Sequence, residues 1–167
     1  MQHHFYAYMA RMKLIKRWGL RHNTREENDQ EHSLQVSMIA HALATYKNRR
    51  YGGDVDVEKV LLYAVYHEAA EVITGDLASP IKYFNPGIRE AFKGIERMAS
   101  AKLMEYLPDD FREDFEKLLF PDENSYEWKI VKAADRISAY VKCLEEYAFG
   151  NREFLTAQET IRASISQ

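Results

Sequence analysis

The sequence has few of the residues on which turns and disulfides depend. It contains one cysteine, seven glycines and four prolines in 167 residues. Glycine and proline together reach roughly half of their usual joint share of about 12%, whereas β-sandwiches and barrels need many Gly and Pro turns. The single cysteine, Cys143, cannot form an internal disulfide. A disulfide-stapled secreted domain is therefore excluded, and a reducing compartment such as the cytoplasm is favoured.

Long hydrophobic runs and a strong excess of one charge are also missing. No apolar run approaches the roughly 20 residues of a membrane span, and the first residues lack the apolar core of a signal peptide. Lys and Arg number 23 against 26 Asp and Glu, which gives a formal net charge of -3. This balance argues against a protein that binds nucleic-acid polymers by neutralising phosphates. We expect a cytoplasmic protein with neither a membrane nor a nucleic-acid partner.

Apolar residues instead recur at steps of three and four along most of the chain, which is the spacing of amphipathic helices. Asp56 is a suitable N-cap, and Asn85-Pro86 pairs an N-cap with proline at the first helical position. We expect helices over residues 4–18, 29–50, 57–74, 86–107, 111–120 and 126–149, and a last one near the C-terminus. No repeat, linker or strand pattern interrupts them. Residues 1–167 therefore predict one all-α domain of about six or seven helices.

Several polar residues occupy positions that should face the core. The stripe of the helix over 29–50 begins at His32 and continues through Val36, Ile39, Leu43 and Tyr46. In the helix over 57–74, Glu68 continues the apolar series, with His67 and Glu71 on the same inward arc. Asp135 lies within the apolar run of the helix over 126–149. Burying such carboxylates costs several kcal/mol unless something compensates their charge.

Two histidines and two acids on inward positions of three helices favour a divalent metal site. Imidazole and carboxylate are common mixed ligands, and the charge of the ion offsets the desolvation of the acids. Each residue alone also has an ordinary explanation. His32 fits a hydrogen-bonded core histidine, Glu71 fits a half-exposed acid paired with a lysine, and Asp135 fits an ion pair with Lys132 or Arg136. These alternatives stay open, but all of them must be true at once to explain the residues without a metal.

The common catalytic motifs of other enzyme classes are missing, and one basic stretch remains to be interpreted. Residues 67–71 resemble the H-E-x-x-H helix of zinc proteases, but glutamate replaces the second histidine and removes a ligand. Glycine-rich nucleotide loops, a nucleophile elbow and C-x-x-C are missing, so dinucleotide, ATP and covalent-serine chemistry have no support. Residues 11–25 carry six basic side chains and no acid. This stretch is either a solvated face or an attractor for an anionic ligand. Within it, Arg17 is suited to bind phosphate, and Trp18 offers a flat wall for a sugar or base.

The constellation of His32, His67 followed by an acid, and a distant Asp135 resembles the H…HD…D pattern of HD-domain metal phosphohydrolases. Local stretches make the resemblance closer. Residues 13–18, 31–36, 41–44, 75–77, 81–85 and 140–146 look like those of the YfbR-type bacterial 5'-deoxynucleotidases. The resemblance runs from about residue 4 to residue 155 and implies an HD-domain helical bundle.

This resemblance also implies an activity and a site. The expected enzyme is a homodimer that uses one divalent metal ion, such as cobalt, manganese or zinc, to remove phosphate from deoxyribonucleoside 5'-monophosphates. Carried over by position, the metal ligands are His32, His67, Glu68 and Asp135. The expected substrate-binding residues are Arg17, Trp18, His32, Glu68, Asp76, Leu77, Ala78, Ser79 and Asp135. Arg17 and Trp18 would favour a sugar without a 2'-hydroxyl, and Glu71 would act as the acid or base.

The chain departs from the family at three places. Glu68 stands where the family has Asp, Ala78-Ser79 where it has Pro-Thr, and Arg136 where it has a small residue. Other possibilities therefore remain: an HD phosphohydrolase for another nucleotide, a metal- or nucleotide-binding protein with weakened catalysis, or a helical interaction protein. The family's chains continue some tens of residues further, so we expect a C-terminal segment to be missing here.

Overall fold

The structure, a computed structural model, describes residues 4–165 and is all-helical apart from one isolated β-bridge between Lys16 and Asn28. The α-helices are α1 (Phe5–Met9), α2 (Asp29–Arg50), α3 (Val57–Tyr66), α4 (Glu71–Thr74), α5 (Ser79–Lys82), α6 (Pro86–Glu105), α7 (Arg112–Leu119), α8 (Tyr126–Ala148) and α9 (Leu155–Ile165). The 3-10 helices are η1 (Ala10–Leu14), η2 (Asp109–Phe111) and η3 (Arg152–Phe154). The all-α prediction is confirmed. Among the described residues, no helix is both long and apolar enough to span a membrane.

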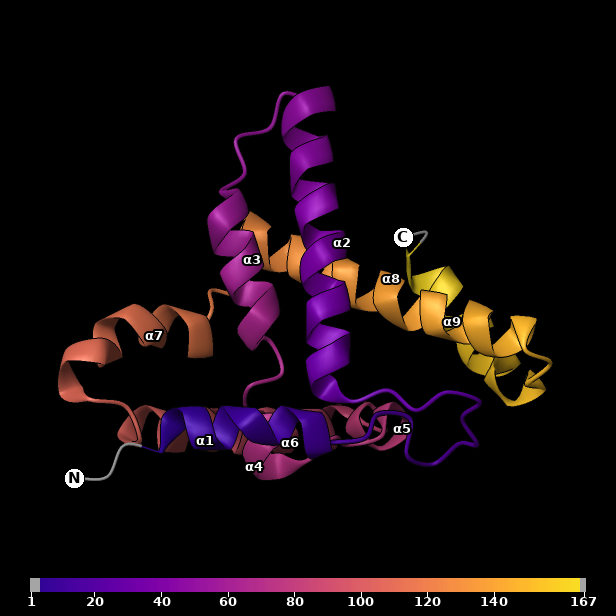
Figure 1. The fold of residues 1–167 in the computed structure, drawn as a ribbon, viewed down its shortest axis with the longest axis horizontal. Coiled ribbons are helices and arrows are strands. Elements are labelled where there is room, and N and C mark those ends of the chain that lie inside the picture. Colours follow the sequence, from indigo (N-terminus) through magenta and orange to yellow (C-terminus); the bar gives the residue numbers. More distant parts are fainter. Residues whose placement is uncertain (1–3, 166–167) are drawn as a thin grey trace.

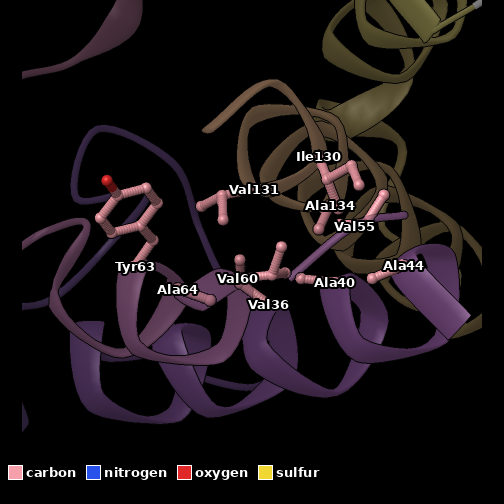
Figure 2. Packing of buried hydrophobic residues seen from close by; sticks show 10 residues of the cluster. All are labelled: Val36, Ala40, Ala44, Val55, Val60, Tyr63, Ala64, Ile130, Val131 and Ala134. Carbon is pink, nitrogen blue, oxygen red and sulfur yellow. The ribbon is translucent and has the colours of Figure 1, made fainter. Parts of the chain in front are cut away.

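The first hydrophobic core lies where α2, α3 and α8 pack against one another, with α8 crossing behind the other two in Figure 1. Its buried residues, shown in Figure 2, are Val36, Ala40, Ala44, Val55, Val60, Tyr63, Ala64, Ile130, Val131 and Ala134. Four of them are alanines, which let the helix backbones approach closely. The rigid three-helix centre carries His32 on α2 and Asp135 on α8.

The second core joins the N-terminal helices to α4 and α6, which lie along the bottom of Figure 1, and to α7, which lies above them at the left. Its buried residues are Phe5, Met12, Ala69, Val72, Leu103, Leu107 and Leu119. The turn over residues 67–70 connects the cores, because α3 ends in the first one and Ala69 packs into the second. Thus His67 and Glu68 lie at the junction of the two cores.

The predicted helix over residues 4–18 is wrong beyond Leu14. The chain becomes extended at Ile15, where the backbone amide of Arg17 donates to the Glu27 carbonyl and that of Asp29 donates to the Ile15 carbonyl. Pairing with residues 27–29 replaces the helical hydrogen bonds. Periodicity could not reveal this partner, which brings Arg17 to the start of α2.

The predicted helix over residues 57–74 is also interrupted. The helix α3 ends at Tyr66, a turn covers residues 67–70, and α4 begins at Glu71. The His67 ring bonds to the Ala64 carbonyl, the acceptor that a continuous helix would offer to the amide of residue 68. The residues between the predicted helices over 57–74 and 86–107 contain a further short helix, α5.

The buried face of α2 is rotated from the predicted stripe. His32 and Val36 are buried as expected, but the core face continues through Ala40 and Ala44, while Tyr46 is 57% exposed. Small residues at these positions allow close approach of α3 and α8. The predicted caps are confirmed, since Asp56 accepts from the Lys59 amide and Asn85 from the Ile88 amide.

Candidate functional site

Four side chains from three parts of the chain gather at one point. Each offers a ligand atom, and these atoms all lie within 4.8 Å of one another: His32, His67, Glu68 and Asp135. His32 lies in the first turn of α2, Asp135 on α8, and the other two in the turn after α3. The structure thus brings together the four residues proposed as metal ligands from the sequence.

The His67 ring is held in one tautomer. Its Nδ1 lies 2.7 Å from the Ala64 carbonyl oxygen, which can only accept, so Nδ1 must donate its hydrogen. The buried Nε2 then carries a lone pair and has no hydrogen-bond partner. Burial lowers the pKa of His67 to about 4, so the ring is neutral near pH 7. A neutral imidazole whose other nitrogen donates to a backbone carbonyl is the usual arrangement of a metal-bound histidine.

His32 and Asp135 contact each other directly. The His32 Nε2 atom lies 3.1 Å from Asp135 Oδ1, while Lys132 Nζ donates to Asp135 Oδ2 over 2.9 Å. Burial opposes the charge of Asp135, but Lys132 and His32 together hold the pKa of this carboxyl well below its usual range. The ion pair between Asp135 and Lys132 that the sequence suggested therefore forms. It uses Oδ2 of Asp135, and Oδ1 stays next to His32.

Glu68 reaches the cluster despite its extra methylene. Its Oε1 lies 3.4 Å from His67 Nε2 and 3.5 Å from Arg17 Nη1. Burial acts to raise the pKa of Glu68, but His67 and Arg17 lower it to about 2. The carboxylate is therefore charged at neutral pH.

Arg17 lies beside the cluster with 13% of its side chain exposed. Besides Glu68, it faces Asp29 Oδ1 at 3.6 Å from Nη1 and Glu27 Oε2 at 3.6 Å from Nε. Burial acts to lower the pKa of Arg17, but Glu68 and Asp135 raise it, so the guanidinium stays charged. Its buried Nε has no hydrogen-bond partner within the described residues.

The other basic residues of the stretch over 11–25 do not act with Arg17 in the same way. Lys16 pairs with Glu26, Arg21 donates to the Glu153 carbonyl, and Arg11 lies over the Tyr8 ring. Arg17, in contrast, contacts Glu68 of the four-residue cluster.

Glu71 begins α4, three residues after Glu68, and is 4% exposed. Burial and the negative charges of Glu68 and Asp29 raise the pKa of Glu71 to about 11. Its Oε2 has no hydrogen-bond partner. The Glu71 carboxyl is therefore protonated at neutral pH, and the nearby charged Glu68 carboxylate contributes to its raised pKa.

The remaining predicted substrate residues lie around this centre. The Trp18 indole N–H donates to Glu27 Oε2 over 3.1 Å, and its ring packs against Phe154. Residues 75–78 connect α4 to α5, and Ser79 begins α5. Asp76 and Ser79 are exposed, and Leu77 and Ala78 are half-buried. Burial raises the pKa of Asp76 while Arg17 acts to lower it, which places Asp76 within the field of Arg17.

Two acids near the centre were missed from the sequence. Glu27 contacts Arg17, Trp18 and His32, the last at 3.8 Å from its Nδ1. Asp29 is fully buried, and neither of its carboxylate oxygens has a hydrogen-bond partner. Asp29 precedes His32 by three residues, so helical spacing could have placed both on one face. No local signal points to Glu27, because it reaches the site through the pairing with residues 15–17.

Comparison with known proteins agrees with this geometry. The profile of the family described as 5'-deoxynucleotidase YfbR-like matches residues 4–167. The chain belongs to this family. The 5'-deoxynucleotidase YfbR of Escherichia coli strain K12 / DH10B is 50% identical over 167 residues, which cover 98% of this chain and 83% of that protein.

Solved structures share the fold of the family. An HD-domain phosphohydrolase from Listeria innocua superposes with a TM-score of 0.86 at 22% identity, covering 98% of this chain and 79% of the other. The HD phosphohydrolase DatZ of cyanophage S-2L, solved with dA and one catalytic Zn²⁺ ion, gives a TM-score of 0.66 at 19% identity, over 95% of this chain and 80% of that one. At these identities the comparison shows an HD-domain fold and nothing more.

Proposed function

We propose that the protein is a metal-dependent 5'-deoxynucleotidase, which hydrolyses deoxyribonucleoside 5'-monophosphates to deoxynucleoside and phosphate. The observation that carries this proposal is the unpartnered Nε2 of His67, buried in a cluster with three further ligand atoms and next to Arg17. Such a cluster suits a cation, and Arg17 suits a phosphate. Membership of the 5'-deoxynucleotidase family supports the same activity.

The four residues of the cluster fit a divalent metal. Two imidazoles and two carboxylates are a donor set that zinc, manganese and cobalt accept. The fold neighbour from the cyanophage, which carries one catalytic Zn²⁺, is consistent with zinc as one candidate. When bound, the ion would supply Lewis-acid polarisation of a phosphate oxygen and a nucleophilic water at neutral pH.

Arg17 and Glu71 would provide the chemistry of the chain itself. Arg17 would bind two phosphate oxygens and stabilise the charge that develops on them. Glu71, protonated near neutral pH, would hold a proton at its carboxyl and deliver it to the departing 5'-oxygen, a role that a raised pKa favours.

Trp18 and residues 76–79 would bind the nucleoside. The indole ring is fixed on one edge by Glu27 and on its face by Phe154, so it can present a rigid apolar edge to the sugar. A rigid wall near C2' would exclude the ribose 2'-hydroxyl by steric and desolvation cost. Asp76, Leu77, Ala78 and Ser79 would line the remaining part of the pocket.

We also propose a cytoplasmic homodimer. The outward face of α2 exposes 63% of Leu34 and 59% of Met38, large apolar side chains of a kind that a second copy can cover. The buried free thiol of Cys143 is compatible with a reducing compartment. Analytical ultracentrifugation of the wild type and of Met38→Glu tests the assembly, which this charge should weaken if the face forms the interface.

The activity is tested by phosphate release from paired deoxyribo- and ribonucleoside monophosphates with zinc, manganese or cobalt, and with EDTA as the control. We expect release from the deoxy substrates and none after chelation. A panel that includes a nucleoside triphosphate and a cyclic dinucleotide would detect the alternative substrates. Release of pyrophosphate or of a linear dinucleotide, with no release from monophosphates, would overturn the proposal.

Glu68→Asp separates an active enzyme from one with weakened catalysis. Because Glu68 already reaches His67 and Arg17, we expect the wild type to turn over and the variant to bring no rescue. An inactive wild type that Glu68→Asp restores would mean that glutamate at this position has cost the protein its activity.

A further inference from the structure

The segment that delivers Arg17 and Trp18 to the site, residues 15–28, has no helix of its own in the described structure. We call it the substrate loop. The two ends of the loop are fixed to each other by the short pairing of residues 15–17 with residues 27–29. Its outer part, residues 21–25, is fixed instead by the end of α8 and by η3, more than one hundred residues later in the chain.

Glu146, near the C-terminal end of α8, is the centre of this second attachment and is 1% exposed. Its carboxylate accepts from the backbone amides of Thr24 at 2.9 Å and Arg25 at 3.3 Å, and from Asn151 Nδ2 at 2.8 Å. Lys142 Nζ, one helical turn earlier, donates both to Glu146 and to the Arg25 carbonyl. Two buried side chains of α8 therefore bind the loop through its backbone.

Residues after α8 continue the attachment. Asn151 Nδ2 donates to the His22 carbonyl at 2.8 Å as well as to Glu146. Glu153 accepts from the His22 amide at 3.2 Å and lies 2.9 Å from its Nδ1, and its carbonyl accepts from Arg21. The α8–η3 corner thus bonds to four positions of the loop: Arg21, His22, Thr24 and Arg25.

The loop needs such support because Trp18 has a positive φ of 58°, an uncommon value for a bulky residue. This conformation costs on the order of 1–3 kcal/mol and persists only where the surroundings hold it. Asn23 Nδ2 donates to the Trp18 carbonyl at 3.2 Å, and Phe154 of η3 contacts the indole ring. Phe154 belongs to the α8–η3 corner, and Asn23 lies between His22 and Thr24, which both bond to that corner.

We propose that Glu146 is a positioning residue for substrate recognition, which fixes the substrate loop so that Trp18 and Arg17 face the nucleotide. The identity of the substrate in this inference rests on the proposed function, whereas the attachment of the loop by Glu146 does not. Glu146 makes no contact with the four-residue cluster in any bond described above. Its effect should therefore appear in substrate affinity and sugar discrimination, and not in metal content.

The charge of Glu146 suits this role. Burial acts to raise the pKa of this carboxyl, but hydrogen bonds from Lys142, the Thr24 amide and Asn151 lower it to about 2. The carboxylate therefore stays ionised under ordinary conditions, and hydrogen bonds to an ionised acceptor are the stronger kind. A neutral amide at this position would lose both the charge and one acceptor.

The test compares Glu146→Gln with Glu145→Gln, an equal charge change at the adjacent, exposed position of α8. KM and kcat for dAMP and AMP are measured, together with metal content and thermal midpoint. A second arm places both variants in a Trp128→Phe background, which leaves Trp18 as the remaining one of the two tryptophans. Its emission maximum and acrylamide quenching then report the loop without any need for activity.

For Glu146→Gln we expect KM for dAMP to rise about tenfold, the size of one lost charge-assisted hydrogen bond. The preference for dAMP over AMP should fall, metal content should stay unchanged, and Trp18 emission should shift to the red with easier quenching. Glu145→Gln should match the wild type. Asn151→Ser, which removes one donor between Glu146 and His22, should act in the same direction and is used if Glu146→Gln does not fold.

A purely structural role would lower the thermal midpoint but leave KM, the dAMP to AMP ratio and Trp18 emission as in Glu145→Gln, and this result would overturn the inference. An inactive wild type would refute the proposed function instead. In that case the Trp18 spectra alone decide, because an unchanged environment of Trp18 contradicts the positioning role whatever the substrate.

Discussion

At the scale of single residues, two neighbouring glutamates have opposite charge states for identifiable reasons. Glu68 faces His67 and Arg17, and its pKa is lowered to about 2. Glu71 is buried beside the charges of Glu68 and Asp29, which together with burial outweigh the opposing effect of Arg17, and its pKa is raised to about 11. Environments that separate two carboxyl pKa values in this way support the proposed roles of Glu68 as a charged ligand and Glu71 as a proton donor.

Glu71→Gln tests the proton donor. The amide keeps the shape and neutrality of the protonated carboxyl but has no acidic proton, so kcat should fall by about 10²–10⁴-fold. Metal content by mass spectrometry and the thermal midpoint should remain close to those of the wild type. Glu90→Gln, on the exposed face of α6, serves as the control. Phosphate release at the wild-type rate would show that Glu71 carries no proton in the reaction.

Trp18→Ala tests sugar discrimination. Removing the indole opens the space that a 2'-hydroxyl would occupy, so the preference for dAMP over AMP should fall by about tenfold or more. The measurement is kcat/KM for both substrates, with Trp128→Phe as the control because Trp128 packs against the helical core. If the variant and the wild type discriminate equally, the 2' position is read by another residue.

At the scale of elements, short interruptions of regular structure position the site. The turn over residues 67–70 carries His67 and Glu68, whose ligand atoms lie within 4.8 Å of those of His32 on α2 and Asp135 on α8. At the start of α2, Asn28 accepts from the amides of Gln30 and Glu31, and Glu31 accepts from the Asn28 amide. This capping box fixes the first helical turn, which contains both Asp29 and His32.

Asn28→Ala should therefore weaken the start of α2. Loss of the cap should lower the free energy of unfolding by about 1 kcal/mol, measured by urea denaturation. Asn28→Asp keeps an oxygen acceptor and adds a negative charge at the helix N-terminus, so it should restore most of the stability. Equal stability of the alanine variant and the wild type would mean that the pairing with residues 15–17 alone holds this end.

The attachment of the substrate loop to α8 should depend on pH. The pKa of Glu146 is lowered from its ordinary value of 4.5 to about 2 in the folded protein. Its stabilisation is therefore present above about pH 4.5 and is lost as the pH falls towards 2. The difference in unfolding free energy between the wild type and Glu146→Gln should shrink over that range. A difference that stays constant with pH would contradict the ionised state of this carboxylate.

At the scale of the whole molecule, the four-residue cluster joins three parts of the chain that are separated by up to 103 residues between His32 and Asp135. An ion bound there would link α2, α8 and the turn after α3, across the junction of the two hydrophobic cores. Binding only to the folded state stabilises that state in proportion to the logarithm of the free metal concentration.

Metal removal should accordingly lower both stability and activity. With free metal at about 100 times its Kd, the gain is about 2.7 kcal/mol, which corresponds to about 5–10 °C in thermal midpoint. EDTA should abolish this shift together with phosphate release, and added zinc, manganese or cobalt should restore both. In His67→Ala the metal should produce little shift. A wild type with the same midpoint in EDTA and in metal would contradict ion binding at the cluster.

Local chemistry in the sequence was sufficient for the long elements. The predicted start of α2 at Asp29 and the caps Asp56 and Asn85 follow from short-range hydrogen bonding and are confirmed. Inward-facing His32 and Asp135 also followed from helical spacing. The roles of Trp18 and residues 76–79 came from the family resemblance and remain predictions.

What the sequence by itself determined is an all-α chain with polar groups on core positions, because helical periodicity and capping depend on residues within a few positions of one another. Only the tertiary structure decided that the first segment leaves its helix at Ile15, that α3 ends before His67, and that Glu27 and Asp29 join Arg17. Glu146 likewise reaches the substrate loop from 122 positions away. Each of these features depends on a hydrogen-bond partner or a charge distant in sequence, and no local pattern contains that partner.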